Sequence, residues 1–280
     1  MVLKYLNRML KKEKSLFITF IFFPLIYLLG WLFITFLIKF FPFLQTNRSL
    51  YGTVITFCLF IYYLPKWSLI KWNKSLYKAI GSINLKNRDL RFNMCFELLK
   101  SSLVILIISF TLIIFDLAEI KFFLNYFLFF NAFFLGIFVA LAEELVFRVW
   151  LFEELNLFFS KKKSNIIQSL IFAFMHLRTD LNFVSNLQIF IGLYLLGLYL
   201  NNWRSKESPS ILLPICFHGG LVTFWFFISN SFLVIDQNLP NLIFGPGEAN
   251  NINPIGGLLG IFILIILNFY SQPKVLKSNV

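Results

Sequence analysis

Two adjacent carboxylates and an arginine follow a long apolar run in this chain. Residues 122–142 carry no charge, so Glu143, Glu144 and Arg148 are expected at the end of a membrane-crossing helix. Ionisable groups at membrane depth are costly and usually serve a function. On a helix, Glu144 and Arg148 share a face and can pair, whereas Glu143 faces elsewhere. The sequence therefore predicts one carboxylate held by the arginine and one available for chemistry.

The only two histidines of the chain also lie in apolar segments, His176 on the expected fifth span and His218 on the seventh. A lone histidine in such a segment is more often a packing residue than a functional one. Because polar groups in hydrocarbon need one another as partners, we expect both to meet Glu143 in a cavity.

Two chemistries follow from this set, and the sequence leaves both open. Glu143, His176 and His218 could bind Zn²⁺ with one position open for a water molecule. Alternatively, Glu143 and His176 activate a water directly, while His218 stabilises the oxyanion.

The composition predicts an all-α polytopic membrane protein. Of 280 residues, 59% are hydrophobic and only 14% are charged, against about 25% charged in soluble domains. We expect a single integral membrane domain over residues 1–280, with N-terminal spans and a basic loop in 1–100 and a helical core in 101–270. About eight transmembrane helices are expected, at residues 15–38, 50–65, 101–117, 122–152, 166–177, 187–200, 211–229 and 255–270. Three cysteines without paired spacing predict no disulfide framework.

Positive charge predicts the orientation in the membrane. With eight spans, 20 of the 25 Lys and Arg residues fall on the side that holds both termini. Cytoplasmic segments carry such an excess, so both termini and the entrance of the cavity are expected on the cytoplasmic side. This placement explains the net charge of +12 without a nucleic-acid partner.

Three motifs in this order resemble the CPBP family, which comprises type II CAAX prenyl endopeptidases and bacteriocin-processing Abi proteins. They are Glu-Glu-x-x-x-Arg at 143–148, Phe-x-x-x-His at 172–176, and the segment that begins at His218. The resemblance covers residues 122–222, with a compatible ending at 253–257. It implies an eight-helix intramembrane protease, described either as a metalloprotease or as glutamate-dependent, with a cavity open to the cytoplasm.

The resemblance also implies a role for each site residue. Glu143 would be the base or metal ligand, Glu144 and Arg148 its structural support, His176 its partner, and His218 part of the oxyanion or ligand set.

One position departs from the family pattern. Four residues after His218 the family has Asn or Asp, but this chain has Val222. An aliphatic side chain cannot donate a hydrogen bond, and loss of one oxyanion donor lowers the rate by about 10²–10³. The neighbouring Thr223 and the backbone of Gly219 and Gly220 are possible substitutes.

The sequence thus predicts an endopeptidase that hydrolyses a peptide bond of a membrane-delivered or prenylated, CAAX-like substrate. The alternative is an inactive relative that acts as a membrane scaffold or an immunity-type binding protein. A proton-coupled transporter is less favoured because the chain shows no inverted repeat.

Overall fold

The computed structural model describes residues 2–123, 125–205, 209–236, 238–247 and 252–271. The chain forms two compact units, Met1–Ala79 and Ile80–Val280. Both units are built from helices, as the expected all-α class requires, with one small sheet in the second unit. The interpretation of the chain as one membrane domain stays a prediction.

The first unit is a helical hairpin of α1 (Val2–Phe40), η1 (Pro42–Asn47) and α2 (Arg48–Trp72). Gly30 permits close packing, since a Cβ atom at this position would collide with the hydroxyl of Thr56. Near the hairpin turn, Arg48 donates a hydrogen bond of 2.9 Å to Thr35 Oγ1. The expected end of the second span at Pro65 is wrong, because α2 accommodates this proline and continues to Trp72.

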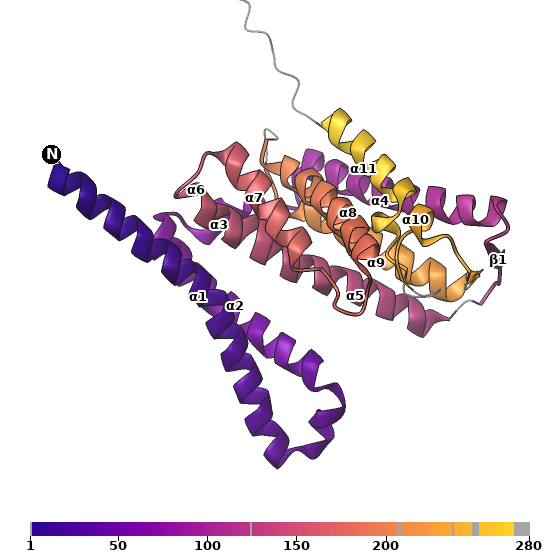
Figure 1. Ribbon diagram of the computed structural model, residues 1–280, viewed down its shortest axis with the longest axis horizontal. Helices are drawn as coiled ribbons and strands as arrows, with labels where there is room; N and C mark the ends of the chain where they lie inside the picture. Colours follow the sequence, from indigo (N-terminus) through magenta and orange to yellow (C-terminus); the bar gives the residue numbers. More distant parts are fainter. Residues whose placement is uncertain (1, 124, 206–208, 237, 248–251, 272–280) are drawn as a thin grey trace, which may run out of the picture. The chain divides into compact units, whose positions relative to one another are not determined.

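The second unit is a helix bundle built around α9 (Leu212–Ser231), which packs against α4 (Arg88–Ile114) and α5 (Tyr126–Glu143) (Figure 1). On its other flank, α8 (Phe183–Asn201) packs against α7 (Lys161–Phe174) and α11 (Leu258–Ser271). The core between these helices is apolar and contains fully buried side chains from several of them, including Ile105, Leu112, Phe172, Phe217 and Leu264. The shorter elements of this unit are η2 (Glu144–Leu151), α6 (Phe152–Asn156), η3 (Asn202–Ser205), α10 (Asn241–Phe244) and η5 (Pro254–Gly256). The short helix α3 (Leu76–Ile80) belongs to the first unit except for its last residue.

A two-stranded antiparallel sheet joins the ends of α4 and α9, and the sequence pattern did not predict it. Strand β1 (Ala118–Ile120) pairs with β2 (Leu233–Ile235), with Ala118 opposite Ile235. The pairing extends to Phe123, whose N–H donates to the carbonyl of Ser231 at 3.0 Å. The fourth helix therefore starts at Tyr126 rather than Phe122, after an N-cap by Asn125.

Six helical segments among the described residues are long and apolar enough to cross a membrane: Phe17–Phe40, Pro42–Trp72, Arg88–Ile114, Tyr126–Asn156, Phe183–Arg204 and Leu212–Ser231. Large apolar side chains are exposed along them, such as Phe127 and Phe138 on α5, as expected for surface that contacts lipid. The chain is an integral membrane protein. Helices α7 and α11 have 14 residues each, which is about 21 Å against a hydrocarbon core of about 30 Å. The expected count of eight spans and the cytoplasmic termini therefore stay predictions.

Close packing of α5 on α9 generates the first testable prediction. A Cβ atom at Gly136 would lie 2.5 Å from the carbonyl oxygen of Gly219 and still closer to the hydroxyl of Thr223. Gly136→Ala should therefore destabilise the protein by about 1–3 kcal/mol, seen as a lower thermal unfolding midpoint of the detergent-purified chain. Gly52→Ala is the matched control, because its Cβ atom would meet its nearest neighbour, Ile34, at 3.4 Å. Equal shifts for the two variants would contradict this packing.

Candidate active site

Glu143, the last residue of α5, lies between the two imidazole rings. Its Oε1 atom is 3.5 Å from Nε2 of His176, and its Oε2 atom is 3.8 Å from Nε2 of His218. The three side chains come from α5, from the turn after α7 and from α9. The structure thus brings together the three residues that the sequence singled out.

Hydrogen bonds to the opposite side of each ring fix its orientation. Nδ1 of His176 is 2.7 Å from the carbonyl oxygen of Phe172; because a carbonyl only accepts, this nitrogen carries the hydrogen. Nδ1 of His218 is 2.9 Å from Oε1 of Glu144, which is likewise an acceptor when ionised. Both rings therefore present Nε2 to Glu143.

Glu144 and Arg148 form a fully buried ion pair beside this cluster. Both side chains are 0% exposed, and Nε of Arg148 is 3.3 Å from Oε2 of Glu144. The guanidinium carbon also lies 3.9 Å from the centre of the Phe172 ring. The predicted pairing is therefore present, and it leaves Glu143 to the histidines. Phe172 serves two neighbours, because its ring covers Arg148 while its carbonyl holds His176.

The segment that carries Glu144 and Arg148 is a π-helix, η2, rather than a continuation of α5. Such wider turns are rare and occur often at functional sites. From η3, Arg204 donates to the carbonyl of Arg148 within η2 and pairs with Glu153 on α6 at 2.9 Å. Sequence reasoning missed this feature because the apolar pattern of residues 144–151 suits an α-helix equally well.

His176 was expected within the fifth span, and this is wrong: α7 ends at Phe174 and His176 lies in the turn that follows. Asn186 on α8 holds this turn. Its Oδ1 accepts from the N–H of Arg178 at 2.9 Å, and its Nδ2 donates to the carbonyls of Arg178 and Leu181 at 2.8 and 3.0 Å. No motif in the sequence identified Asn186 as a support for His176.

The cluster opens into a cavity of about 380 Å³. Apart from Glu143 and the histidines, its walls are mostly apolar, with Ile105, Leu135, Val139, Leu193, Leu196 and Trp225 among the residues that line it. Val222 also lines the cavity, so the position where the family has Asn or Asp presents only methyl groups here. An apolar cavity with a few convergent polar groups is the usual form of a ligand or substrate site.

The three predicted metal ligands do not fit a metal ion in their present arrangement. Among the residues that the structure describes, no group of three or more His, Cys, Asp or Glu side chains could hold one. Both Nε2 atoms instead face the carboxylate of Glu143 directly.

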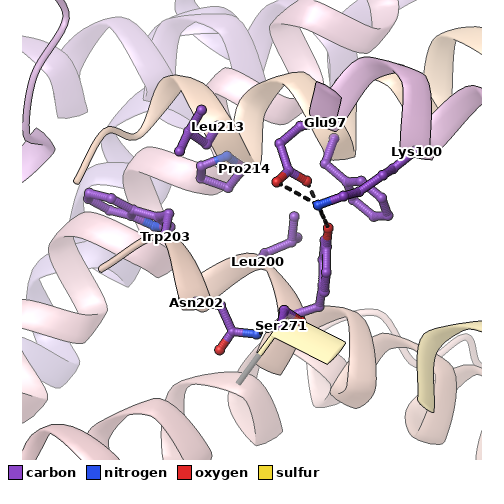
Figure 2. A pocket seen from close by; sticks show the side chains of 10 residues that line it. Glu97, Lys100, Leu200, Asn202, Trp203, Leu213, Pro214 and Ser271 are labelled. Atoms are coloured by element: carbon purple, nitrogen blue, oxygen red, sulfur yellow. Dashed lines mark hydrogen bonds and ion pairs between the residues drawn. The ribbon is translucent and has the colours of Figure 1, made fainter. Parts of the chain in front are cut away.

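A second cavity of about 230 Å³ lies between α4, α8 and α9 (Figure 2). Figure 2 shows Lys100 pointing toward Glu97. The ammonium group of Lys100 donates to Oε1 of Glu97 at 3.0 Å and to the hydroxyl of Tyr199 at 3.2 Å. The hydroxyl of Tyr199 also donates to Oε2 of Glu97 at 2.7 Å. Phe217 lines this cavity while the next residue, His218, lines the first. The Glu97 network thus links α4 to α8 next to the site.

The buried pair generates a prediction about stability. Removing one partner leaves an uncompensated buried charge, so Glu144→Gln should cost about 3–5 kcal/mol, and so should Arg148→Met. The double variant should lose less than the sum of the two single variants. The thermal unfolding midpoint in detergent measures these changes.

Asp180→Asn is the matched control for that experiment. It removes an exposed ion pair, in which the side chains of Arg178 and Asp180 are 48% and 60% exposed. The midpoint should stay unchanged because exposed ion pairs contribute little to stability. Additive losses in the Glu144/Arg148 double variant would show that the two side chains are not coupled.

Two segments of the chain match models of known families. Residues 125–224 match the model of the type II CAAX prenyl endopeptidase Rce1-like family, and this segment contains Glu143, His176 and His218. Residues 7–76 match a domain of unknown function (DUF8676), a range that falls within the first structural unit. No curated protein and no solved structure was found to match the chain. The match supports the assignment of residues 125–224 to the CPBP family of CAAX proteases.

Proposed function

We propose that this protein is an intramembrane endopeptidase that uses Glu143 to activate a water molecule. The observation that carries the proposal is the position of the Glu143 carboxylate, 3.5 Å and 3.8 Å from two imidazole nitrogens in an apolar cavity. A carboxylate at this position can hold a water molecule together with His176 and accept its proton.

Hydrolysis would proceed by general acid–base catalysis. A water bound between Glu143 and His176 gives a proton to the Glu143 carboxylate as its oxygen attacks the carbonyl carbon of the peptide. The carbonyl π electrons move to oxygen and form a tetrahedral oxyanion. When the C–N bond breaks, the electron pair leaves with nitrogen, which takes the proton from Glu143. The products are a new carboxyl group and a free amine.

The histidines have different parts in this scheme. Because Nδ1 of His176 donates to Phe172, the neutral ring offers a lone pair at Nε2 and can orient the water. His218 contacts both carboxylates, through Nδ1 to Glu144 at 2.9 Å and through Nε2 toward Glu143 at 3.8 Å. A protonated His218 would stabilise the oxyanion, and Glu144 would support that charge.

The substrate class follows from the lining of the cavity and from the family match. Walls of Leu, Ile and Val side chains suit an apolar or lipidated substrate, and the matched family is that of CAAX prenyl endopeptidases. We therefore propose a membrane-delivered or prenylated, CAAX-like peptide as substrate. The charge distribution supports entry from the cytoplasmic side.

The alternative, an inactive relative that acts as a scaffold or binding protein, has less support. Its motivation was Val222, but each of the five other charged or imidazole side chains of the site contacts at least one of the others: Glu143, Glu144, Arg148, His176 and His218. A scaffold or binding protein has no need of a carboxylate held between two imidazoles.

Glu143→Gln tests the proposal, because the amide keeps the shape of the side chain and cannot accept the proton. Cleavage of a reporter peptide with an S-farnesylated CAAX ending should fall to background, while the thermal unfolding midpoint stays near that of the wild type. Membrane-peptide profiles of cells with wild type or Glu143→Ala extend the test to substrates of other sequence. Unchanged product formation in both assays would contradict the proposal.

A chelator distinguishes the side-chain mechanism from the zinc mechanism that the sequence left open. Cleavage of the farnesylated reporter should persist after treatment with 1,10-phenanthroline, because the proton transfers need only Glu143 and the histidines. Loss of cleavage that Zn²⁺ restores would show instead that Glu143, His176 and His218 rearrange to bind the metal.

A further inference from the structure

The site lacks the hydrogen-bond donor that Val222 cannot supply, and the substitutes suggested by the sequence do not provide one. The N–H groups of Gly219 and Gly220 lie inside α9 and are used by the helix itself. Thr223 faces α5, where its hydroxyl lies against Gly136, and it does not line the cavity. A donor must therefore come from another element.

Asn253, just before η5, lines the same cavity as Glu143 and Val222. Its Oδ1 atom accepts a hydrogen bond from the N–H of Ile255 at 3.2 Å. Because the N–H of Ile255 needs an acceptor, the atom of Asn253 that faces it must be the amide oxygen. The amide nitrogen, Nδ2, therefore points away from Ile255. Within the described residues, Nδ2 of Asn253 forms no hydrogen bond, so both of its hydrogens are available to a substrate.

Trp225 places Asn253 near the position of the missing donor. Its indole N–H donates to the carbonyl of Ile252 at 3.0 Å, which ties the segment before η5 to α9. Side chains on a helix lean toward its N-terminus, so the indole covers the preceding turn. Val222 lies on that turn. The residue after Ile252 is thus held on the side of α9 where Trp225 lies, and it lines the same cavity as Val222.

The backbone around Asn253 is held from both sides, as preorganised donation requires. The N–H of Asn253 donates to the carbonyl of Pro246 at 2.9 Å, and its own carbonyl accepts from Gly256 at 3.0 Å. Gly245 has φ of 113° and lies so close to this carbonyl that a Cβ atom would collide with it. From α8, Gln188 donates to the carbonyls of Leu242 and Gly256 at 3.1 and 3.4 Å.

We propose that Asn253 is the oxyanion donor of this protease: its Nδ2 donates to the scissile carbonyl oxygen as that oxygen becomes negatively charged, in place of the residue lost at Val222. This inference rests on the proposed peptidase function. It makes Asn253 a catalytic residue supplied by the segment that follows α10 rather than by α9.

Asn253→Asp is the most selective test, because the carboxylate keeps the acceptor for Ile255 and removes the donor. With the full chain and the farnesylated reporter, kcat should fall by about 10²–10³ while KM changes little. Asn253→Ser, which retains a neutral acceptor, shows whether the loss comes from the missing amide or from the added charge. Adding Val222→Asn to Asn253→Asp should raise kcat again, since a donor returns on α9.

Asn125→Asp is the matched control. The side chain of Asn125 also accepts a hydrogen bond at the start of a helix, from the N–H of Phe127 at 2.9 Å, but it does not line the cavity. The kcat of Asn125→Asp should therefore equal that of the wild type. Thermal unfolding midpoints show whether each variant folds. If Asn253→Asp is destabilised, the Val222→Asn rescue shows whether its lower kcat comes from the lost donor.

The outcomes separate the two proposals. If Glu143→Gln is inactive but Asn253→Asp and Asn253→Ser keep the wild-type kcat, the peptidase function stands and the role of Asn253 is overturned. The role is also overturned if Asn253→Asp is impaired and Val222→Asn gives no rescue. If Glu143→Gln cleaves like the wild type, both proposals fall.

Discussion

The candidate site depends on the ion pair between Glu144 and Arg148, two side chains with no exposed surface. An arginine buried in this cluster could pair with either of two carboxylates, Glu143 or Glu144, and the pairing decides what each carboxylate can do. Because Arg148 contacts Glu144, Glu143 stays with the histidines. The aromatic face of Phe172, 3.9 Å from the guanidinium, helps to keep Arg148 in this position. The main effect of the pair is thus to determine which carboxylate faces the histidines, rather than to add net stability to the fold.

From this pair, one chain of contacts extends through the whole cluster. Glu144 contacts Arg148 with one oxygen and His218 with the other. His218 and His176 then face Glu143 from two sides. Each ring has its Nδ1 engaged by an oxygen, which is the arrangement that fixes a tautomer. A hydrolytic water in this setting would meet the Glu143 carboxylate and two oriented imidazoles, within walls that are otherwise mostly apolar.

The sequence predicted the residues of the site better than the structural elements that hold them. Charged and imidazole groups stranded in apolar segments are conspicuous, and their need for partners predicted that Glu143, His176 and His218 converge. The spacing of Glu144 and Arg148 likewise predicted their contact. The π-helix at 144–151, the turn that holds His176 and the small sheet were missed, because each depends on tertiary contacts such as those of Arg204 and Asn186. In the sequence, Asn253 belonged only to a segment, 253–257, that is compatible with the end of the family pattern. Its neighbouring residues do not reveal that this segment packs against α9.

The central claim is that Arg148 holds Glu144 and thereby leaves Glu143 between the two histidines. An experimental structure of the full chain in lipid nanodiscs tests it most directly. The account predicts Arg148 in contact with Glu144, and both Nε2 atoms within about 4 Å of the Glu143 carboxylate, close enough to share one water. Arg148 paired with Glu143, or either imidazole turned toward lipid, would contradict it.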